Sequence, residues 1–370
     1  MHVLVTYALP FLLVLTVLVF VHELGHCLIA RRNGVRVEVF SIGFGPELFG
    51  FTDRVGTRWK FSAVPFGGYV KMFGDASAAS QPSEALKTMT AEERKVSFQH
   101  KRLGQRAAVV AAGPIANYIF AILILLCLFA TAGEPYTAPV VGGIEPNTAA
   151  AEAGLAAGDR ILEVDGSNIE RFEDITRIVQ LRPGQKMPIV VNRSGETITL
   201  TATPRLSVQT DNFGNEHRVG LLGIKSGNRE FRQLDPATAA WRAVVETANL
   251  TTSMLEAIGQ MIVGLRDAEE IGGPIAIAKM SGDVAQLGFN QLLWFLAVLS
   301  INLGMINLFP IPMLDGGHLL FYAIEAVRGR PLGDRAQEWG FRIGLALVLT
   351  LMLFATWNDL TKIIFKEIAS

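Results

Sequence analysis

The chain has 370 residues, of which 50% are hydrophobic and 18% charged, and its mean hydropathy is positive. This composition predicts a polytopic α-helical protein of the lipid bilayer with room for one further soluble domain. The net charge of -1 and the pI near 6.6 exclude the basic balance of nucleic-acid binders, so no nucleic acid is expected as a partner. Cys27 and Cys127 lie in apolar runs without a C-x-x-C motif, and we expect both to be packing residues.

Residues 1–32 are predicted to form the first transmembrane helix, because no charge interrupts the run from Val3 to Val21. The run leads into the pentapeptide His22-Glu23-Leu24-Gly25-His26. Positions i and i+4 share one face of a helix, so the two imidazoles can bind one metal ion. Glu23 beside them is a candidate base for the attacking water, and the spacing is typical of zinc hydrolases.

Two simpler origins of this motif are disfavoured. A secretory signal peptide would begin with basic residues and would not end in ionisable ones. A chance H-E-x-x-H would place a glutamate between two histidines in hydrocarbon. This burial costs several kcal/mol, so the motif is expected to persist there only if it has a function.

Residues 33–75 alternate apolar and polar side chains with glycine between them, which predicts membrane-associated β-hairpins. An exposed strand edge there could pair with an extended peptide. The alternative is a cytosolic β-subdomain without a substrate role. Residues 76–106 are polar, and we expect a mobile cytoplasmic loop.

Three further spans are predicted at residues 107–133, 287–318 and 341–366. Under the positive-inside rule, the basic residues that end the first span and precede the second are cytoplasmic, namely Arg31, Arg32, Lys101, Arg102 and Arg106. The segment after Gly133 and the C-terminus are then external.

Residues 138–227 contain short strands and two short helical stretches. The run from Gly142 to Gly166 resembles a PDZ domain of the circularly permuted bacterial kind. The predicted fold is therefore four transmembrane helices with a β-hairpin region and one inserted PDZ domain of the α+β class. Such a domain could bind C-terminal peptide tails or act as a size filter.

Residues 228–285 follow as an amphipathic helical region, which could lie in the membrane interface or pack on the PDZ domain.

A catalytic zinc ion needs a third protein ligand. Asp315 is the best candidate, because it follows an apolar run and two prolines, and span parity returns it to the side of His22 and His26. Asp315 could instead cap the helix that begins at Gly316. His318 is also a possible ligand, and the simplest allocation is that one of the two binds the metal while the other supports it.

The order of these motifs resembles the site-2 protease family of intramembrane zinc metalloproteases, most closely its RseP-type members. The resemblance is carried by HELGH, by Gly113-Pro114-Ile115-Ala116-Asn117, by the PDZ insert and by NLFPIPMLDGG. Many enterobacterial relatives carry two tandem PDZ domains, whereas this chain has space for one.

The resemblance implies that Zn²⁺ is bound by His22, His26 and Asp315 and that Glu23 is the general acid/base. It assigns two further groups: His318 and Asn117 beside the ligands, and substrate-binding residues at Asn307, Pro310, Pro312, Gly67, Gly68 and Tyr69.

The implied substrates are single-span membrane proteins, such as anti-sigma factors or signal-peptide remnants. The implied location is a bacterial inner membrane, with the active site near the cytoplasmic side and the PDZ domain outside. A catalytically silent scaffold that holds partner tails is the alternative.

Overall fold

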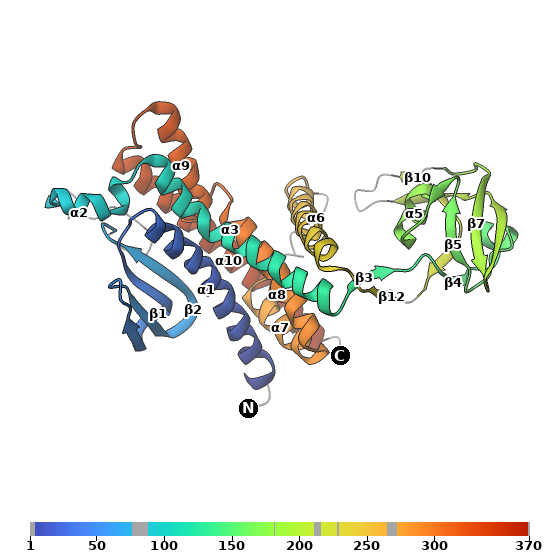
Figure 1. Cartoon of the computed structure of the whole chain (residues 1–370), viewed down its shortest axis with the longest axis horizontal. Coiled ribbons are helices and arrows are strands. Elements are labelled where there is room, and N and C mark those ends of the chain that lie inside the picture. The colour runs from blue at the N-terminus through green and yellow to red at the C-terminus, as the bar shows by residue number, and fades with distance from the viewer. Residues whose placement is uncertain are drawn as a thin grey trace. The chain divides into compact units, whose positions relative to one another are not determined.

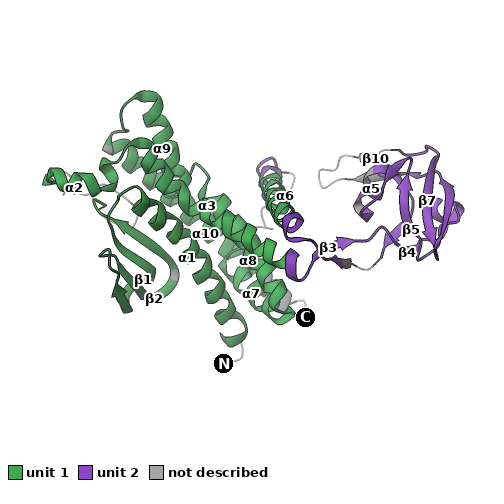
Figure 2. Ribbon diagram, viewed as in Figure 1, with its two compact units in different colours: residues 1–128, 240–258, 267–370 green, residues 129–239, 259–266 purple. Residues whose placement is uncertain are grey.

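The computed structural model describes residues 4–75, 88–180, 182–210, 216–227, 229–264 and 272–368. It divides into two compact units, coloured separately in Figure 2. The first, here called the helical unit, comprises residues 1–128, 240–258 and 267–370. The second, here called the β unit, comprises residues 129–239 and 259–266.

Among the described residues, four helices are long and apolar enough to cross a membrane, the number that the sequence predicts. The candidate spans are Val5–Arg32, Leu103–Thr131, Phe289–Asn307 and Arg335–Thr361. They lie in a π-helical turn η1 (Leu4–Ala8) followed by α1 (Leu9–Arg32), and in α3 (Leu103–Thr131), α8 (Phe289–Asn307) and α10 (Asp334–Ile368) (Figure 1).

The predicted third span, residues 287–318, contains two separate helices. Helix α8 ends at Asn307, because Pro310 and Pro312 cannot continue a helix without losing backbone hydrogen bonds. Asp315 then begins α9 (Asp315–Arg328). The turn between the two helices therefore places Asp315 at a helix start.

The β-hairpin prediction for residues 33–75 agrees with two long antiparallel strands, β1 (Val37–Thr52) and β2 (Arg58–Met72). Both strands bend, so residues 39–42 pair with residues 68–71 on one side and with residues 58–61 on the other. Residues 68–71 thus form one edge of this sheet within the described chain.

The base of the sheet packs on α1. The ring of Phe40 lies edge-on to Phe20 of α1 and stacks on Trp59 of β2, with centroid distances of 5.7 and 4.2 Å. At the hairpin turn, Asp53 accepts hydrogen bonds from Arg31 at the end of α1 and from the Trp59 indole. Burial raises the pKa of the Asp53 carboxyl. These hydrogen bonds, together with those from backbone amides of the turn that follows Asp53, outweigh burial and hold this pKa well below its usual range.

The predicted loop at residues 76–106 is wrong for its second part, whereas residues 76–87 lie outside the described chain. Helix α2 (Ala91–Val96) begins with a capping box between Thr90 and Glu93. A 3₁₀ turn, η3 (Phe98–His100), follows it. Phe98 is buried in the cluster that includes Met72 and Val109. This one apolar side chain packs the segment onto the helical unit, although the segment is polar in composition.

The predicted helical region at residues 228–285 contains one strand and two helices, α6 (Pro236–Ile262) and α7 (Pro274–Leu287). Helix α7 contacts α1 and α8. The Asp359 carboxylate of α10 accepts hydrogen bonds from the backbone N–H groups of Gly273 and Ala276, at 2.9 Å each. This cap satisfies the free donors at the start of α7.

The β unit is built from short antiparallel pairs around one four-stranded sheet of order β6-β5-β7-β8. Its strands are β3 (Glu134–Thr137), β4 (Val141–Ile144), β5 (Arg160–Val164), β6 (Ser167–Asn168), β7 (Met187–Arg193), β8 (Glu196–Ala202), β9 (Arg205–Thr210), β10 (Glu216–Leu221), β11 (Ile224–Ser226) and β12 (Arg229–Arg232). The remaining pairs join β3 to β12, β4 to β11 and β9 to β10. In the described part of this unit, helices α4 (Ala149–Glu152) and α5 (Phe172–Gln180) complete it.

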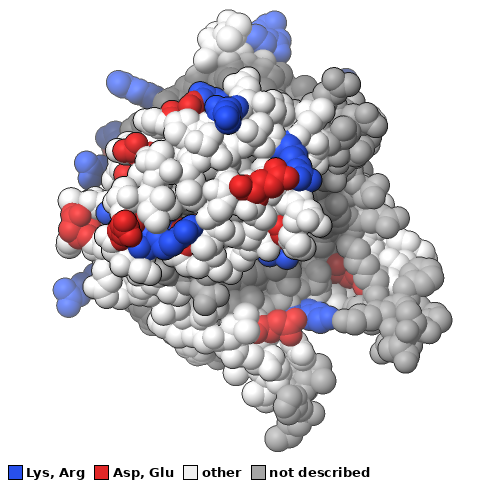
Figure 3. Space-filling model, turned by 90° about the vertical axis from the view of Figure 1, so that its right-hand side faces the viewer, with Lys and Arg blue, Asp and Glu red and all other residues white. Residues whose placement is uncertain are grey.

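Apolar side chains from both helices and the central strands form the core of the β unit, among them Ala150, Ile161, Ile175, Ile189 and Val191. The face in Figure 3 carries basic and acidic side chains interspersed among uncharged ones, with neither sign gathered over the part of the chain described there.

Candidate metal centre

Helix α1 carries His22, Glu23 and His26 into the interior of the helical unit. Both imidazoles are buried, and their rings meet edge to face with centroids 4.8 Å apart. The helix can approach α3 closely because Gly25 has no side chain: a Cβ there would lie 2.3 Å from the Ala112 carbonyl oxygen. This close approach brings α3 against the histidine face.

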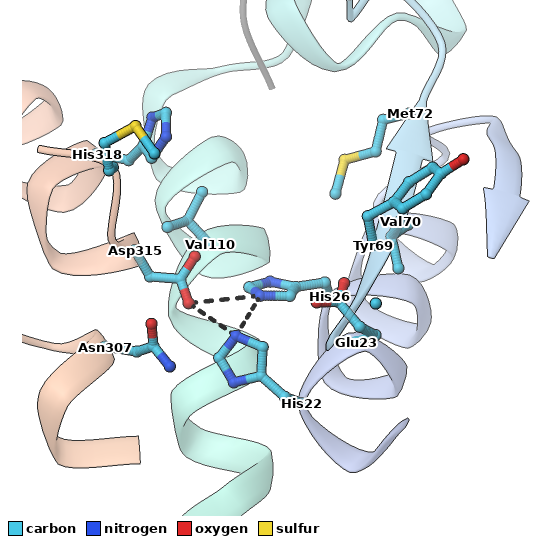
Figure 4. A pocket seen from close by; sticks show the side chains of 12 residues that line it. His22, Glu23, His26, Tyr69, Val70, Met72, Val110, Asn307, Asp315 and His318 are labelled. Atoms are coloured by element: carbon cyan, nitrogen blue, oxygen red, sulfur yellow. Dashed lines mark hydrogen bonds and ion pairs between the residues drawn. The ribbon is translucent and has the colours of Figure 1, made fainter. Parts of the chain in front are cut away.

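Asp315 completes a three-residue cluster with these histidines (Figure 4). Its Oδ2 lies 3.1 Å from His22 Nε2 and 3.5 Å from His26 Nε2. The two Nε2 atoms are 3.2 Å apart. A tetrahedral zinc ion with bonds of about 2.0–2.1 Å holds its ligand atoms about 3.3–3.4 Å apart. The spacing of the three atoms therefore fits one zinc ion.

The hydrogen-bond pattern also fits a metal at this position. Asp315 Oδ2 is buried and has no hydrogen-bond partner among the described residues. A buried oxygen without a donor is costly, and a cation would satisfy it. Two imidazoles and a carboxylate are a donor set that zinc prefers and that leaves a fourth position free.

Partners on the far side of each ring orient the histidines. The Nδ1 atom of His26 donates to the Val109 carbonyl oxygen at 2.8 Å, which leaves Nε2 free to face a metal. The Nδ1 atom of His22 lies 3.2 Å from the Asn117 amide nitrogen. Oxygen and nitrogen of such an amide are interchangeable by a flip. The flipped amide would accept from His22 and would also give Asn117 Oδ1, which has no partner in the described chain, a donor.

Gly113 makes room for both imidazoles. A Cβ at this position in α3 would lie 2.2 Å from His26 Nε2 and 2.9 Å from His22 Nε2. Side-chain carbons do not approach other atoms so closely. The residue at position 113 must therefore lack a side chain if α3 is to support the cluster.

A cavity of about 220 Å³ opens beside the cluster. Glu23 lines it together with Gly68, Tyr69, Val70 and Met72 of β2, and Figure 4 shows this strand on the Glu23 side of the cavity. Val70 and Glu23 line the same cavity. The candidate base and a strand edge therefore lie next to each other at the metal position.

Of the other site residues that the sequence predicted, the structure places some at this cavity and others elsewhere. Asn307 lines the cavity on the Asp315 side, and its amide nitrogen donates to the Leu303 carbonyl oxygen at 3.0 Å. Gly67 lines a different, apolar cavity. Among the described residues around the catalytic cavity, neither Pro310 nor Pro312 is found.

Pro312 instead packs against α10. A Cβ at Gly344 would lie 1.8 Å from the Pro312 carbonyl oxygen. Helix α10 and the turn before α9 therefore contact each other through their backbones. His318 also lines the cavity, and its ring packs on Phe341, with centroids 5.3 Å apart. No hydrogen bond from His318 to the ligand atoms is found in the described structure.

Three features of the site escaped the sequence reasoning. The Gly113 contact and the Val109 carbonyl arise from helix packing, and their only sequence signal is a Gly-Pro pair inside an apolar helix. Met313 lines the cavity with φ of 91°. A non-glycine residue in that region is strained and is often found at functional sites.

A membrane-type helical chain in which an H-E-x-x-H helix meets a distant aspartate belongs to the class of metallopeptidases. Comparison with known proteins gives the family. The model of Peptidase family M50 matches residues 10–351, and the chain belongs to this family, the site-2 protease family. It is a zinc metalloprotease.

Full-length relatives agree. A protein of Agrobacterium fabrum, named as a zinc metalloprotease, is 49% identical over 97% of this chain and 96% of its own length. Metalloprotease MmpA of Caulobacter vibrioides is 40% identical and covers 96% of each chain. The resemblance stated from the motifs is thereby confirmed.

Solved structures match part of the chain. The HtrA-type protease AlgW with a decapeptide is 37% identical over 19% of this chain and 22% of its own, with a TM-score of 0.18. The PDZ domain of an SdrC-like protein from Listeria innocua is 18% identical over 26% of this chain and 99% of its own, with a TM-score of 0.20.

Proposed function

We propose that this zinc metalloprotease cleaves single-span membrane proteins within or beside the bilayer, with His22, His26 and Asp315 as zinc ligands. The observation that carries the proposal is the spacing of the three ligand atoms, 3.1 to 3.5 Å, between residues at opposite ends of the chain. Two of them lie in a helix of membrane-spanning length. A hydrolytic centre at that depth has intramembrane peptide bonds within reach.

When bound, zinc supplies the Lewis-acid chemistry of peptide hydrolysis. The Glu23 carboxylate lies beside the ligand cluster and accepts a proton from the attacking water. It then donates that proton to the nitrogen of the leaving amine, which returns Glu23 to its carboxylate form. Asn117 and the Val109 carbonyl keep both imidazoles in the orientation that binding requires.

The substrate is held as an extended strand along residues 68–71 of β2. These residues pair with β1 on one side only, and Gly68, Tyr69 and Val70 line the catalytic cavity. Peptide bonds inside a helix are hydrogen-bonded internally, so the substrate must unwind, and strand addition would satisfy the backbone groups that unwinding frees. Asn307, across the cavity, supplies a further amide.

The protein resides in a bacterial inner membrane with the catalytic centre toward the cytoplasm. Basic residues support this orientation: Arg31 and Arg32 end α1, and Arg106 lies in the first turns of α3. The same rule places the β unit outside. By family resemblance, its substrates include membrane-anchored anti-sigma factors and signal-peptide remnants.

The β unit is the circularly permuted PDZ domain in this proposal. Deleting it separates the two uses that the sequence left open. A size filter predicts faster cleavage of substrates with bulky external domains, whereas a reader of C-terminal tails predicts weaker binding of those tails and no faster cleavage.

A Glu23→Gln variant tests the chemistry on a tagged single-span substrate in detergent. Glutamine keeps the shape of the side chain but cannot carry the proton, so cleavage should fall by at least about 100-fold. Glu92→Gln on the exposed face of α2 is the matched control and should cleave at the wild-type rate. Cleavage by Glu23→Gln at the wild-type rate would exclude the mechanism, and a catalytically silent scaffold predicts no cleavage by any variant.

A further inference from the structure

A second, polar cavity of about 390 Å³ lies in the helical unit. Its walls come from η3, the start of α3, helix α9, and the turn into α10. The lining residues that bear polar groups are Gln99, Arg106, His318, Tyr322, Glu325 and Gln337. None of the chemistry described above uses this cavity.

His318 joins this cavity to the catalytic one, because its side chain lines both. The C-terminal end of β2 also leads from the catalytic cavity to the polar cavity. Met72 lines the catalytic cavity, and the next residue, Phe73, accepts a backbone hydrogen bond from Phe98 at 3.1 Å. Gln99, one residue further along, lines the polar cavity. A chain extended along β2 past the metal position would therefore reach the polar cavity next.

Arg106 gives the polar cavity a buried hydrogen-bond donor. Its guanidinium pairs with Glu325 at 2.5 Å and lies over the Tyr322 ring at 4.9 Å. Both charged side chains are largely buried, with 13% and 17% of their surfaces exposed. Arg106 Nε has no hydrogen-bond partner among the described residues. A buried donor of this kind is costly unless something binds it.

The cavity on the other side of the catalytic centre has the opposite character. It is about 400 Å³ and is lined almost wholly by apolar side chains of α1, α7 and α8, together with Gly67 of β2. Along β2, apolar surroundings at Gly67 thus give way to the metal position at Gly68–Met72 and then to the polar cavity. A membrane segment that continues into a polar tail has the same order.

We propose that the polar cavity binds the polypeptide that follows the membrane segment of the substrate on its cytoplasmic side. The Arg106 guanidinium would hydrogen-bond the extended backbone of that tail. The cleaved bond is then the one at the boundary between apolar and polar residues. This inference rests on the proposed function, because it assigns a binding site for the same substrates.

Two substrates with one membrane segment test the inference. The first keeps its polar cytoplasmic tail, and the second ends one or two residues beyond the cleaved bond. The double variant Arg106→Gln with Glu325→Gln removes both charges of the pair together, so neither is left buried alone. It should raise KM about tenfold for the tailed substrate, with kcat and the KM of the tailless substrate unchanged.

Arg102→Gln is the matched control, because Arg102 is exposed near the start of the same helix and does not line the cavity. It should leave both KM values unchanged. Equal losses on both substrates in the double variant would indicate a structural role and overturn the inference, as would no loss on either. If Glu23→Gln cleaves both substrates at the wild-type rate, the proposed function itself fails, so the two failures are distinguishable.

Disulfide trapping locates the tail directly. Leu332→Cys places a thiol in the wall of the polar cavity, and Val327→Cys places one on an exposed position of α9 outside it. With Glu23→Gln present and Cys127 changed to alanine, a cysteine three to five residues beyond the cleaved bond, roughly 10–18 Å along an extended chain, should cross-link to position 332 only. Cross-links to position 327 alone, or to neither, would contradict the assignment.

Discussion

Gly113→Ala is a small substitution that should disable the metal centre. The new Cβ would lie 2.2 Å from His26 Nε2, whereas an ordinary contact begins near 3.4 Å. The imidazole or helix α3 must therefore move by the difference, 3.4 − 2.2 = 1.2 Å. A displacement of about 1 Å at a reacting centre costs roughly 100-fold in rate, and disturbed ligand orientation costs about 10–100-fold in metal affinity. We expect losses of that size in both.

Zinc content by elemental analysis and cleavage of a single-span substrate measure the two effects. Gly104→Ala is the control, because it lies in the same helix with nothing within 4 Å of the added carbon. The melting temperature of each variant in detergent separates a local effect from unfolding. If Gly113→Ala binds zinc fully and cleaves at the wild-type rate, the close approach of α3 to the imidazoles is not as described.

Three further predictions concern the metal, its support and the β unit. Chelation should abolish cleavage and added zinc should restore it; cleavage that survives metal removal would contradict a metal-dependent site. Asn117→Ala should weaken zinc binding about 10–100-fold in a chelator competition, because His22 Nδ1 loses its partner; unchanged affinity would show that Asn117 does not support the ligand. In the β unit, hydrogen bonds from Arg193 hold the pKa of Asp159 below its usual value near 3.8. The pair therefore stabilises the unit above that value and loses its effect as the pH falls through the lower pKa of the folded state. Asp159→Asn should cost about 1–2 kcal/mol near neutral pH, since the Asp159 side chain is buried while 36% of the Arg193 side chain is exposed, and less at about pH 3. Thermal unfolding of the full chain measures both, and equal losses at both pH values would exclude this account.

The sequence predicted the features that depend on a pattern within a single segment. The four apolar runs and the i, i+4 spacing of His22 and His26 are local patterns, and both agree with the helices of the structure. Asp315 was reached by counting spans, and the structure places its carboxylate 3.1 Å from His22 Nε2. Asp315 is also the first residue of α9, but the N-cap is Leu314 and no side-chain cap hydrogen bond is made, so the alternative that Asp315 caps this helix is wrong.

Contacts between distant segments could not be predicted in the same way. The match between Gly113 and the imidazoles depends on how closely α1 and α3 approach, and periodicity does not report interhelical distance. Helix α7 is a separate helix within the single amphipathic region predicted for residues 228–285, and its packing on α1 and α8 is not encoded in the local sequence pattern. The central position of residues 39–42 in the sheet follows from bends in both strands, which alternation of apolar residues does not encode.

Mapping the cleaved bond tests the central claim most directly. Wild-type protein in proteoliposomes would be given a single-span substrate, and mass spectrometry would locate the new termini. The account predicts a cut at the cytoplasmic end of the apolar segment, where it meets the polar residues, and this cut is absent with Glu23→Gln. New termini confined to the soluble parts of the substrate, or the same cut with Glu23→Gln at the wild-type rate, would contradict it.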